Sequence, residues 1–123
     1  MNTPRATFIS AKITIPGLHR WPTAHDSRAY LRDMHRHLFH VTVIIPVSHN
    51  ERDVEFHDLA EMVRRLILQD IATDFRDGLA HFGERSCETL AEQLGGLLQE
   101  FHNITPHRIT WSEDGEFAAE LRY

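Results

Sequence analysis

Apolar and polar residues alternate or cluster along the chain in a way that predicts four strands. Residues 7–16 alternate strictly, with Ile and Ala on one face and mostly Ser, Lys and Thr on the other, as expected for a half-buried strand. Three further stretches are also predicted to be strands: residues 37–47, 107–113 and 116–123. Asp114-Gly115 between the last two is a tight-turn signal, so these two strands should form a hairpin.

Two other stretches place apolar residues at helical spacing. The first helix is predicted to begin at Asp58, because Glu61 three residues later completes a capping-box pattern. The second is predicted to begin after Ser86, which is a favourable N-cap residue. Close packing of this second helix on a sheet would explain why the Gly95-Gly96 pair occurs in its middle.

The order of these elements predicts the fold class. Residues 17–34 and 72–85 are predicted to be loops, with Pro16-Gly17 ending the first strand. The order β-β-α-α-β-β describes a single α+β domain over residues 1–123, in which a four-stranded antiparallel sheet carries two helices on one face. The other face of the sheet is expected to hold Phe, Ile, Val, Trp and Ala side chains that also need cover, so we expect a homo-oligomer.

Composition narrows the class of protein. The chain is 41% hydrophobic and 25% charged, and no apolar run approaches the length of a membrane span. Its formal net charge is −5, and its basic residues are scattered among acids, which argues against a nucleic-acid partner. Cys87 is the only cysteine and the first residues lack the apolar core of a secretion signal, so we expect a cytoplasmic protein without intrachain disulfides.

The 10 histidines of the chain are a high content that points to metal or proton chemistry. His35 and His37 lie two positions apart at the start of the second strand, so their side chains share a face, whereas His40 faces the other way. His19 and His25 are candidates for a third zinc ligand; His19 is preferred, because a hairpin places the end of the first strand beside the start of the second. Two histidines alone are more often ordinary polar residues of a strand, and the third favours a Zn²⁺ site.

Five segments of the sequence follow one another in a recognisable order. Residues 15–22 contain His19, and residues 35–39 contain the His-x-His pair. Three further segments follow at residues 54–59, 85–88 and 112–113. Together they resemble the motifs of the 6-pyruvoyl-tetrahydropterin synthase family, which includes the 6-carboxy-tetrahydropterin synthase of queuosine biosynthesis. The resemblance covers nearly the whole chain and implies the family's T-fold, with zinc on His19, His35 and His37.

The same resemblance implies an activity and an assembly. The family acts on dihydroneopterin triphosphate, a pterin-like small molecule, in a carbon–oxygen lyase reaction. It forms a trimer whose sheets close into a barrel, stacked as a hexamer, with pockets between subunits. The acidic net charge of this chain makes the binding of a triphosphate less obvious.

Glu113, Ser86 and Cys87 are the candidate substrate-binding residues. The resemblance makes Glu113 the group that grips the ring, and a carboxylate can accept two hydrogen bonds from adjacent donors of a pterin or purine ring; otherwise Glu113 is an exposed turn acid. Ser86 and Cys87 lie at a helix N-terminus whose free amides can bind ring carbonyls, although Ser86 also fits a plain cap. An exposed Cys87 there should have a lowered pKa and is a candidate catalytic nucleophile or base, whereas a buried one is a small core residue.

The proton-transfer residues of the family are missing from their usual positions. No cysteine lies shortly before His35, where Asp33 is the only nearby carboxylate, and residues 70–77 contain no Asp-His pair. The candidate replacements are Asp33, His25, His81 and Cys87, and the sequence does not choose among them.

Three functions therefore compete. The first is a zinc-dependent synthase of the type that the resemblance implies. The second is a non-catalytic or repurposed module that binds a purine- or pterin-like molecule, which the missing catalytic set motivates. The third, ranked last, is an oligomeric scaffold in which the histidines are structural.

Overall fold

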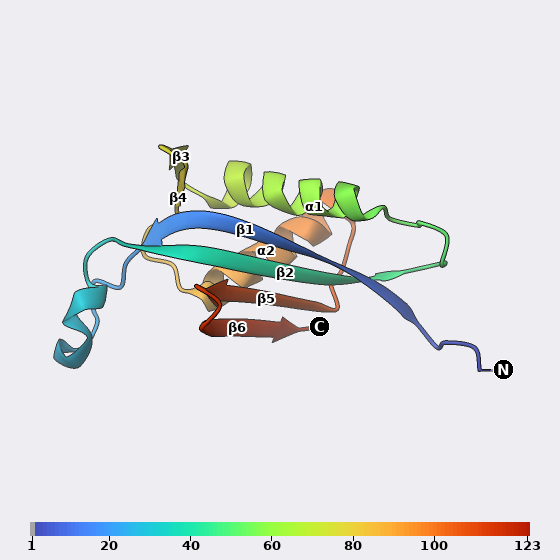
Figure 1. Ribbon diagram of the computed structural model, residues 1–123, viewed down its shortest axis with the longest axis horizontal. Helices are drawn as coiled ribbons and strands as arrows, with labels where there is room; N and C mark the ends of the chain where they lie inside the picture. The colour runs from blue at the N-terminus through green and yellow to red at the C-terminus, as the bar shows by residue number, and fades with distance from the viewer. Residues whose placement is uncertain (1) are drawn as a thin grey trace.

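The computed structural model of the chain describes residues 2–123. A six-stranded sheet has the strand order β3-β4-β1-β2-β5-β6, and two long helices lie along it (Figure 1). The strands are β1 (Thr7–His19), β2 (His35–Val47), β3 (Asp74–Arg76), β4 (Leu79–His81), β5 (Arg108–Glu113) and β6 (Phe117–Arg122). The helical elements are the short 3-10 segment η1 (Asp26–Leu31), α1 (Phe56–Arg65), its π-helical continuation η2 (Leu66–Ile71), and α2 (Cys87–His102).

The sheet has six strands, which corrects the expected four. The two additional strands, β3 and β4, lie in the segment for which the sequence predicts a loop. The Asp77-Gly78 turn joins them, with φ angles of 54° and 74°. β4 pairs in parallel with β1 at Gly17 and Leu18. A strand of three residues is too short to show an alternating pattern, and the strand beside it is distant in the sequence, so local pattern could not reveal it.

The hairpin of β1 and β2 is longer than predicted, and its two strands together supply the three clustered histidines. β1 continues through Pro16-Gly17 to His19 instead of ending at Pro16. Pro16 has no N–H to donate, and β4 pairs with β1 only beyond it, so the proline costs no hydrogen bond to β4. In the register of the hairpin, His19 lies opposite His35 and Gly17 lies opposite His37.

Both long helices begin at a capping side chain. α1 begins after Glu55, whose carboxylate accepts hydrogen bonds from the His57 and Asp58 amides, so Glu55 rather than Asp58 is the cap. α2 begins after Ser86, as predicted, and the Ser86 hydroxyl accepts a hydrogen bond from the Thr89 amide. Gly95 of α2 is buried, and a Cβ there would overlap the hydroxyl of Tyr123, which explains this glycine by close packing.

The core lies between the helices and one face of the sheet. α1 packs on β1, and α2 packs on β5 and β6 (Figure 1). The largest side chains without solvent contact include Phe39, Phe82 and Trp111, whose rings pack edge to face. Among the described residues, no helix is long and apolar enough to cross a membrane.

The opposite face of the sheet is polar over its centre, contrary to the expectation of apolar side chains. Ser10, Lys12 and Thr14 project there from β1 and are exposed. Val41, Val43 and Ile45 of β2, and Trp111 of β5, belong to the helix-covered core instead. Phe8 and Leu38 are large apolar residues outside the core, with 43% and 40% of their surface exposed. Homo-oligomerisation therefore stays a prediction. The outer face of the sheet does not support it, because this face is polar over its centre.

Candidate metal site and adjoining cavity

Three histidines meet at one end of the β1–β2 hairpin. The register of the strands brings together His19, His35 and His37, and one ring nitrogen of each lies within 4.8 Å of the others. His40 lies on the other face, where its Nδ1 is 3.0 Å from the Thr14 hydroxyl. His25, the alternative third ligand, is exposed near Trp21 and is not part of this cluster. The structure thus brings together the three residues that the sequence suggested.

The Nδ1 atom of each histidine in the cluster is already engaged by an oxygen. The Nδ1 of His19 lies 3.1 Å from the Arg85 carbonyl oxygen, and that of His35 lies 2.9 Å from the Asp33 carbonyl oxygen. The Nδ1 of His37 lies 2.6 Å from a carboxylate oxygen of Asp114. Because carbonyl and carboxylate oxygens accept, each Nδ1 carries the proton and each Nε2 is left as the metal-binding atom.

The Nε2 atom of His37 has no hydrogen-bond partner although it is buried. Among the described residues it is one of few buried side-chain nitrogen or oxygen atoms in that state. A buried nitrogen without a partner is costly, and a metal ion at this point would satisfy it. The donor set of three neutral imidazoles therefore fits Zn²⁺.

Asp114 positions His37 and was not identified as a site residue from the sequence. It occupies the left-handed region in the turn between β5 and β6, with φ of 56°. One carboxylate oxygen faces His37, and the other accepts a hydrogen bond of 2.7 Å from the Leu38 amide. The Leu38 amide and His37 both lower the pKa of the Asp114 carboxyl, so it is ionised at neutral pH. Asp114-Gly115 looks like a plain turn in the sequence because only the β2–β5 pairing places it against His37.

Arg85 positions His19 in a comparable way. Its guanidinium donates to the carbonyl oxygens of Ile71, at 2.6 Å, and Phe82, at 3.1 Å, and to the side chain of Gln93, at 2.6 Å. These three bonds hold the segment before α2, whose Arg85 carbonyl in turn faces His19. The sequence contains no local signal for this role, because it uses a backbone oxygen.

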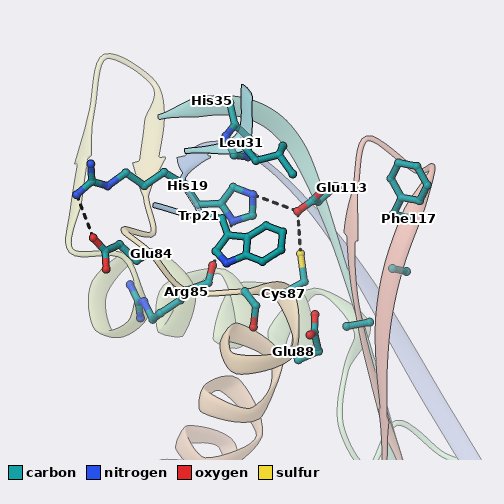
Figure 2. Close-up of a pocket in the computed structure, with 14 residues that line it drawn as sticks. His19, Trp21, Leu31, His35, Glu84, Arg85, Cys87, Glu88, Glu113 and Phe117 are labelled. Carbon is teal, nitrogen blue, oxygen red and sulfur yellow. Dashed lines mark hydrogen bonds and ion pairs between the residues drawn. The ribbon is translucent and has the colours of Figure 1, made fainter. Parts of the chain in front are cut away.

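Glu113, at the end of β5, lies against the histidine cluster. Its Oε1 is 3.1 Å from His19 Nε2, and its Oε2 is 3.5 Å from His37 Nε2. The Cys87 thiol donates to the same Oε1 over 3.5 Å, so the carboxylate sits between the imidazole and the thiol (Figure 2). The contact with His19 is the main cause that lowers the pKa of the Glu113 carboxyl, and the proximity of His37 adds to it.

A cavity of about 380 Å³ opens beside the cluster. His19, His35 and Glu113 form one wall of this cavity. Trp21, Leu31 and Phe117 supply apolar surface, and the first residues of α2 supply another wall (Figure 2). This volume is at the small end of ligand pockets and suits a single heterocycle.

The two catalytic candidates lie in different surroundings. Cys87 lines the cavity but is only 7% exposed, and burial together with Glu113 raises the pKa of its thiol. The lowered pKa expected for an exposed Cys87 therefore does not apply.

Asp33 is exposed and does not line the cavity, and its carbonyl oxygen contacts His35 Nδ1. Ser86 both caps α2 and lines the cavity. A catalytic role for Cys87 or Asp33 stays a prediction.

Replacement of Asp114 by asparagine is expected to weaken zinc binding by about 10- to 100-fold, because it removes the carboxylate that orients His37. Asn tolerates the left-handed backbone of this turn, so the hairpin should persist. Competition with a chelating dye measures the affinity. Glu116→Gln removes the same charge two residues away and serves as the control. Equal affinities of Asp114→Asn and the control would show that the carboxylate does not support His37.

Comparison with known proteins relates the fold to solved structures. No protein-family model matches the sequence, and no curated protein is significantly similar to it. An uncharacterised protein of Wolinella succinogenes is 12% identical, with a TM-score of 0.71 over 97% of this chain and 99% of that chain. The 6-pyruvoyl tetrahydropterin synthase of Caenorhabditis elegans is 11% identical, with a TM-score of 0.64 over 100% and 99%.

A third similar structure comes from a catalytic-residue mutant. It is the 6-pyruvoyltetrahydropterin synthase of Plasmodium vivax, which is 12% identical, with a TM-score of 0.63 over 98% of this chain and 99% of that chain. At this level of identity the match is one of fold, and the sequences have diverged widely. The chain has the fold of the 6-pyruvoyl tetrahydropterin synthases, as its sequence motifs led us to expect.

Proposed function

We propose that the protein binds Zn²⁺ through His19, His35 and His37 and acts on a pterin-like molecule in the adjoining cavity. The observation that carries this proposal is the engagement of all three Nδ1 atoms by fixed oxygens. It leaves three Nε2 atoms, on neighbouring strands, as a prepared set of neutral ligands. An ordinary cluster of polar strand residues has no reason to hold three rings in one tautomer.

The cavity supports a flat heterocyclic ligand. Trp21, Leu31 and Phe117 provide apolar surface for the faces of a ring, and Ser86 and Glu113 provide polar groups at its edge. When bound, the zinc ion would act as a Lewis acid on a carbonyl or hydroxyl of the ligand's side chain. The reaction we propose is the carbon–oxygen lyase reaction of the synthases whose fold the chain shares.

The charges around the cavity favour recognition of the ring over recognition of a triphosphate. Arg20 lines the cavity but forms an ion pair of 3.0 Å with Glu84. The guanidinium of Arg85 is engaged by two carbonyl oxygens and Gln93. Glu88 adds a further acid to the lining. The resemblance of the sequence to the synthase family makes dihydroneopterin triphosphate the expected substrate. The cavity suits the ring and side chain of this molecule better than its triphosphate.

A second candidate function is binding without turnover. The observation that favours it is the state of the two catalytic candidates: Cys87 is buried with a raised pKa, and Asp33 lies outside the cavity lining. A protein with a zinc site and a ring pocket, but no poised proton-transfer group, would capture a pterin or purine and release it unchanged.

Metal analysis and ligand incubation test the proposal together. The purified protein should contain about one zinc ion per chain, in line with one cluster of three ligands. Dihydroneopterin triphosphate should then bind only to the zinc-loaded protein, with adenosine triphosphate as the control for the triphosphate group. Appearance of a pterin product supports the synthase, and binding without product supports the second candidate. Protein that takes up no zinc would refute both.

A further inference from the structure

The carboxylate of Glu113 occupies an unusual position, because it faces the metal-binding atoms of two of the three histidines. The distances are 3.1 Å to His19 Nε2 and 3.5 Å to His37 Nε2. We propose that Glu113 is a fourth protein ligand of the zinc ion and closes the site in the absence of a ligand. This inference rests on the proposed function, since it requires that the three histidines bind a metal.

The first argument is geometric. Zinc ligands lie about 2.0–2.2 Å from the ion in a tetrahedral arrangement, which places neighbouring ligand atoms about 3.3–3.6 Å apart. The contacts of Glu113, at 3.1 Å and 3.5 Å, are close to this spacing. The 3.1 Å contact would also suit an N–H···O hydrogen bond, so the position of the ring protons decides between the two.

The second argument is electrostatic. The Nδ1 atoms of His19 and His37 carry their protons toward the Arg85 carbonyl and the Asp114 carboxylate. In the neutral rings, both Nε2 lone pairs then face an anionic carboxylate, which is repulsive. A cation between them removes this repulsion, and a nitrogen that binds zinc cannot also donate a hydrogen bond to Glu113. With the metal bound, Glu113 must therefore either bind the ion or leave its position.

The third argument is that Glu113 is held in place. Its backbone is paired with Phe39 in the β2–β5 register, so the side chain starts from a fixed strand beside the cluster. The Cys87 thiol donates to Oε1 from the other side. This contact gives the buried Cys87 a role in positioning Glu113 that does not require a thiolate.

A closed site of three histidines and one glutamate has a consequence for ligand binding. A ring that donates hydrogen bonds to both oxygens of Glu113 would compete with the metal for this carboxylate. Arrival of the ring would then free a coordination position at the moment when it is needed. In the absence of a ring, Glu113 excludes other anions from the metal.

Cobalt-substituted protein tests this inference without any measurement of activity. Thiocyanate is titrated into the Co²⁺-loaded wild type and the Glu113→Ala variant, and visible absorption reports its coordination. We expect thiocyanate to bind the variant at least about 10-fold more tightly than the wild type, and zinc affinity to fall by at least about 10-fold in the variant. Glu88→Ala removes another glutamate from the cavity lining and should behave as the wild type.

The possible failures can be told apart. Wild type that binds thiocyanate as tightly as Glu113→Ala would overturn the inference and leave the three-histidine site intact. Wild type that takes up neither cobalt nor zinc would refute the proposed function itself. If Glu113→Ala does not fold, Glu113→Gln keeps the shape of the side chain, and an unchanged zinc affinity in that variant would also overturn the inference.

Discussion

The His37→Ala protein is expected to lose its bound zinc, retaining less than about a tenth of the wild-type content after dialysis. His37 supplies a buried Nε2 atom that has no hydrogen-bond partner among the described residues. Its removal leaves two imidazoles, which together with a carboxylate hold zinc much less tightly than the complete set. It also leaves the Asp114 carboxylate without the ring that it orients.

His40→Ala is the matched control for this experiment. His40 lies on the same strand, three residues further along, but its ring faces the opposite side of the sheet and contacts Thr14. Elemental analysis should find wild-type zinc in His40→Ala, and circular dichroism should show that both variants are folded. Full retention of zinc by His37→Ala would refute the assignment of the three ligands.

The Gly17→Ala protein is expected to be less stable than the wild type by about 3 kcal/mol. A Cβ at Gly17 would lie 2.9 Å from each of three atoms: the Ala80 carbonyl oxygen, Phe39 Cε2 and Phe82 Cε2. One of these is backbone and the other two belong to fully buried rings, so none can move away cheaply. A loss of this size is a large part of the total stability of a typical domain.

Gly96→Ala provides the control of opposite sign. Nothing lies within 4 Å of a Cβ at Gly96, so alanine there should raise stability by about 1 kcal/mol through helix propensity. Urea unfolding curves of both variants measure the difference. Since the ring of Phe39 also packs against His19 and His37, displacement of this ring should disturb the metal cluster as well. A Gly17→Ala protein as stable as the wild type would contradict the close approach of β1 and β4.

Features of the fold that depend on neighbouring residues could be predicted from the sequence. The Ser86 cap, the Asp114-Gly115 turn and the long alternating strands all arise within a few residues of chain. The short strands β3 and β4 could not be predicted, because their formation depends on the exposed edge of β1 beside them. The sequence also predicts that β1 ends too early, at Pro16, for the same reason. A proline can stay within β1 there because β4 does not pair with it and needs no hydrogen bond from it.

Within the candidate site, local sequence pattern was enough to predict that His35 and His37 share a face, because side chains alternate along a strand. The sequence also suggested His19, because a hairpin places the end of its first strand beside the start of its second. The atoms that surround these rings depend on long-range packing and could not be predicted from local sequence. The Asp114 carboxylate, the Arg85 carbonyl and Glu113 reach the cluster from turns and strands far along the chain. Packing likewise buries Cys87. This burial raises the pKa of the thiol, whereas its position at a helix N-terminus would have lowered it.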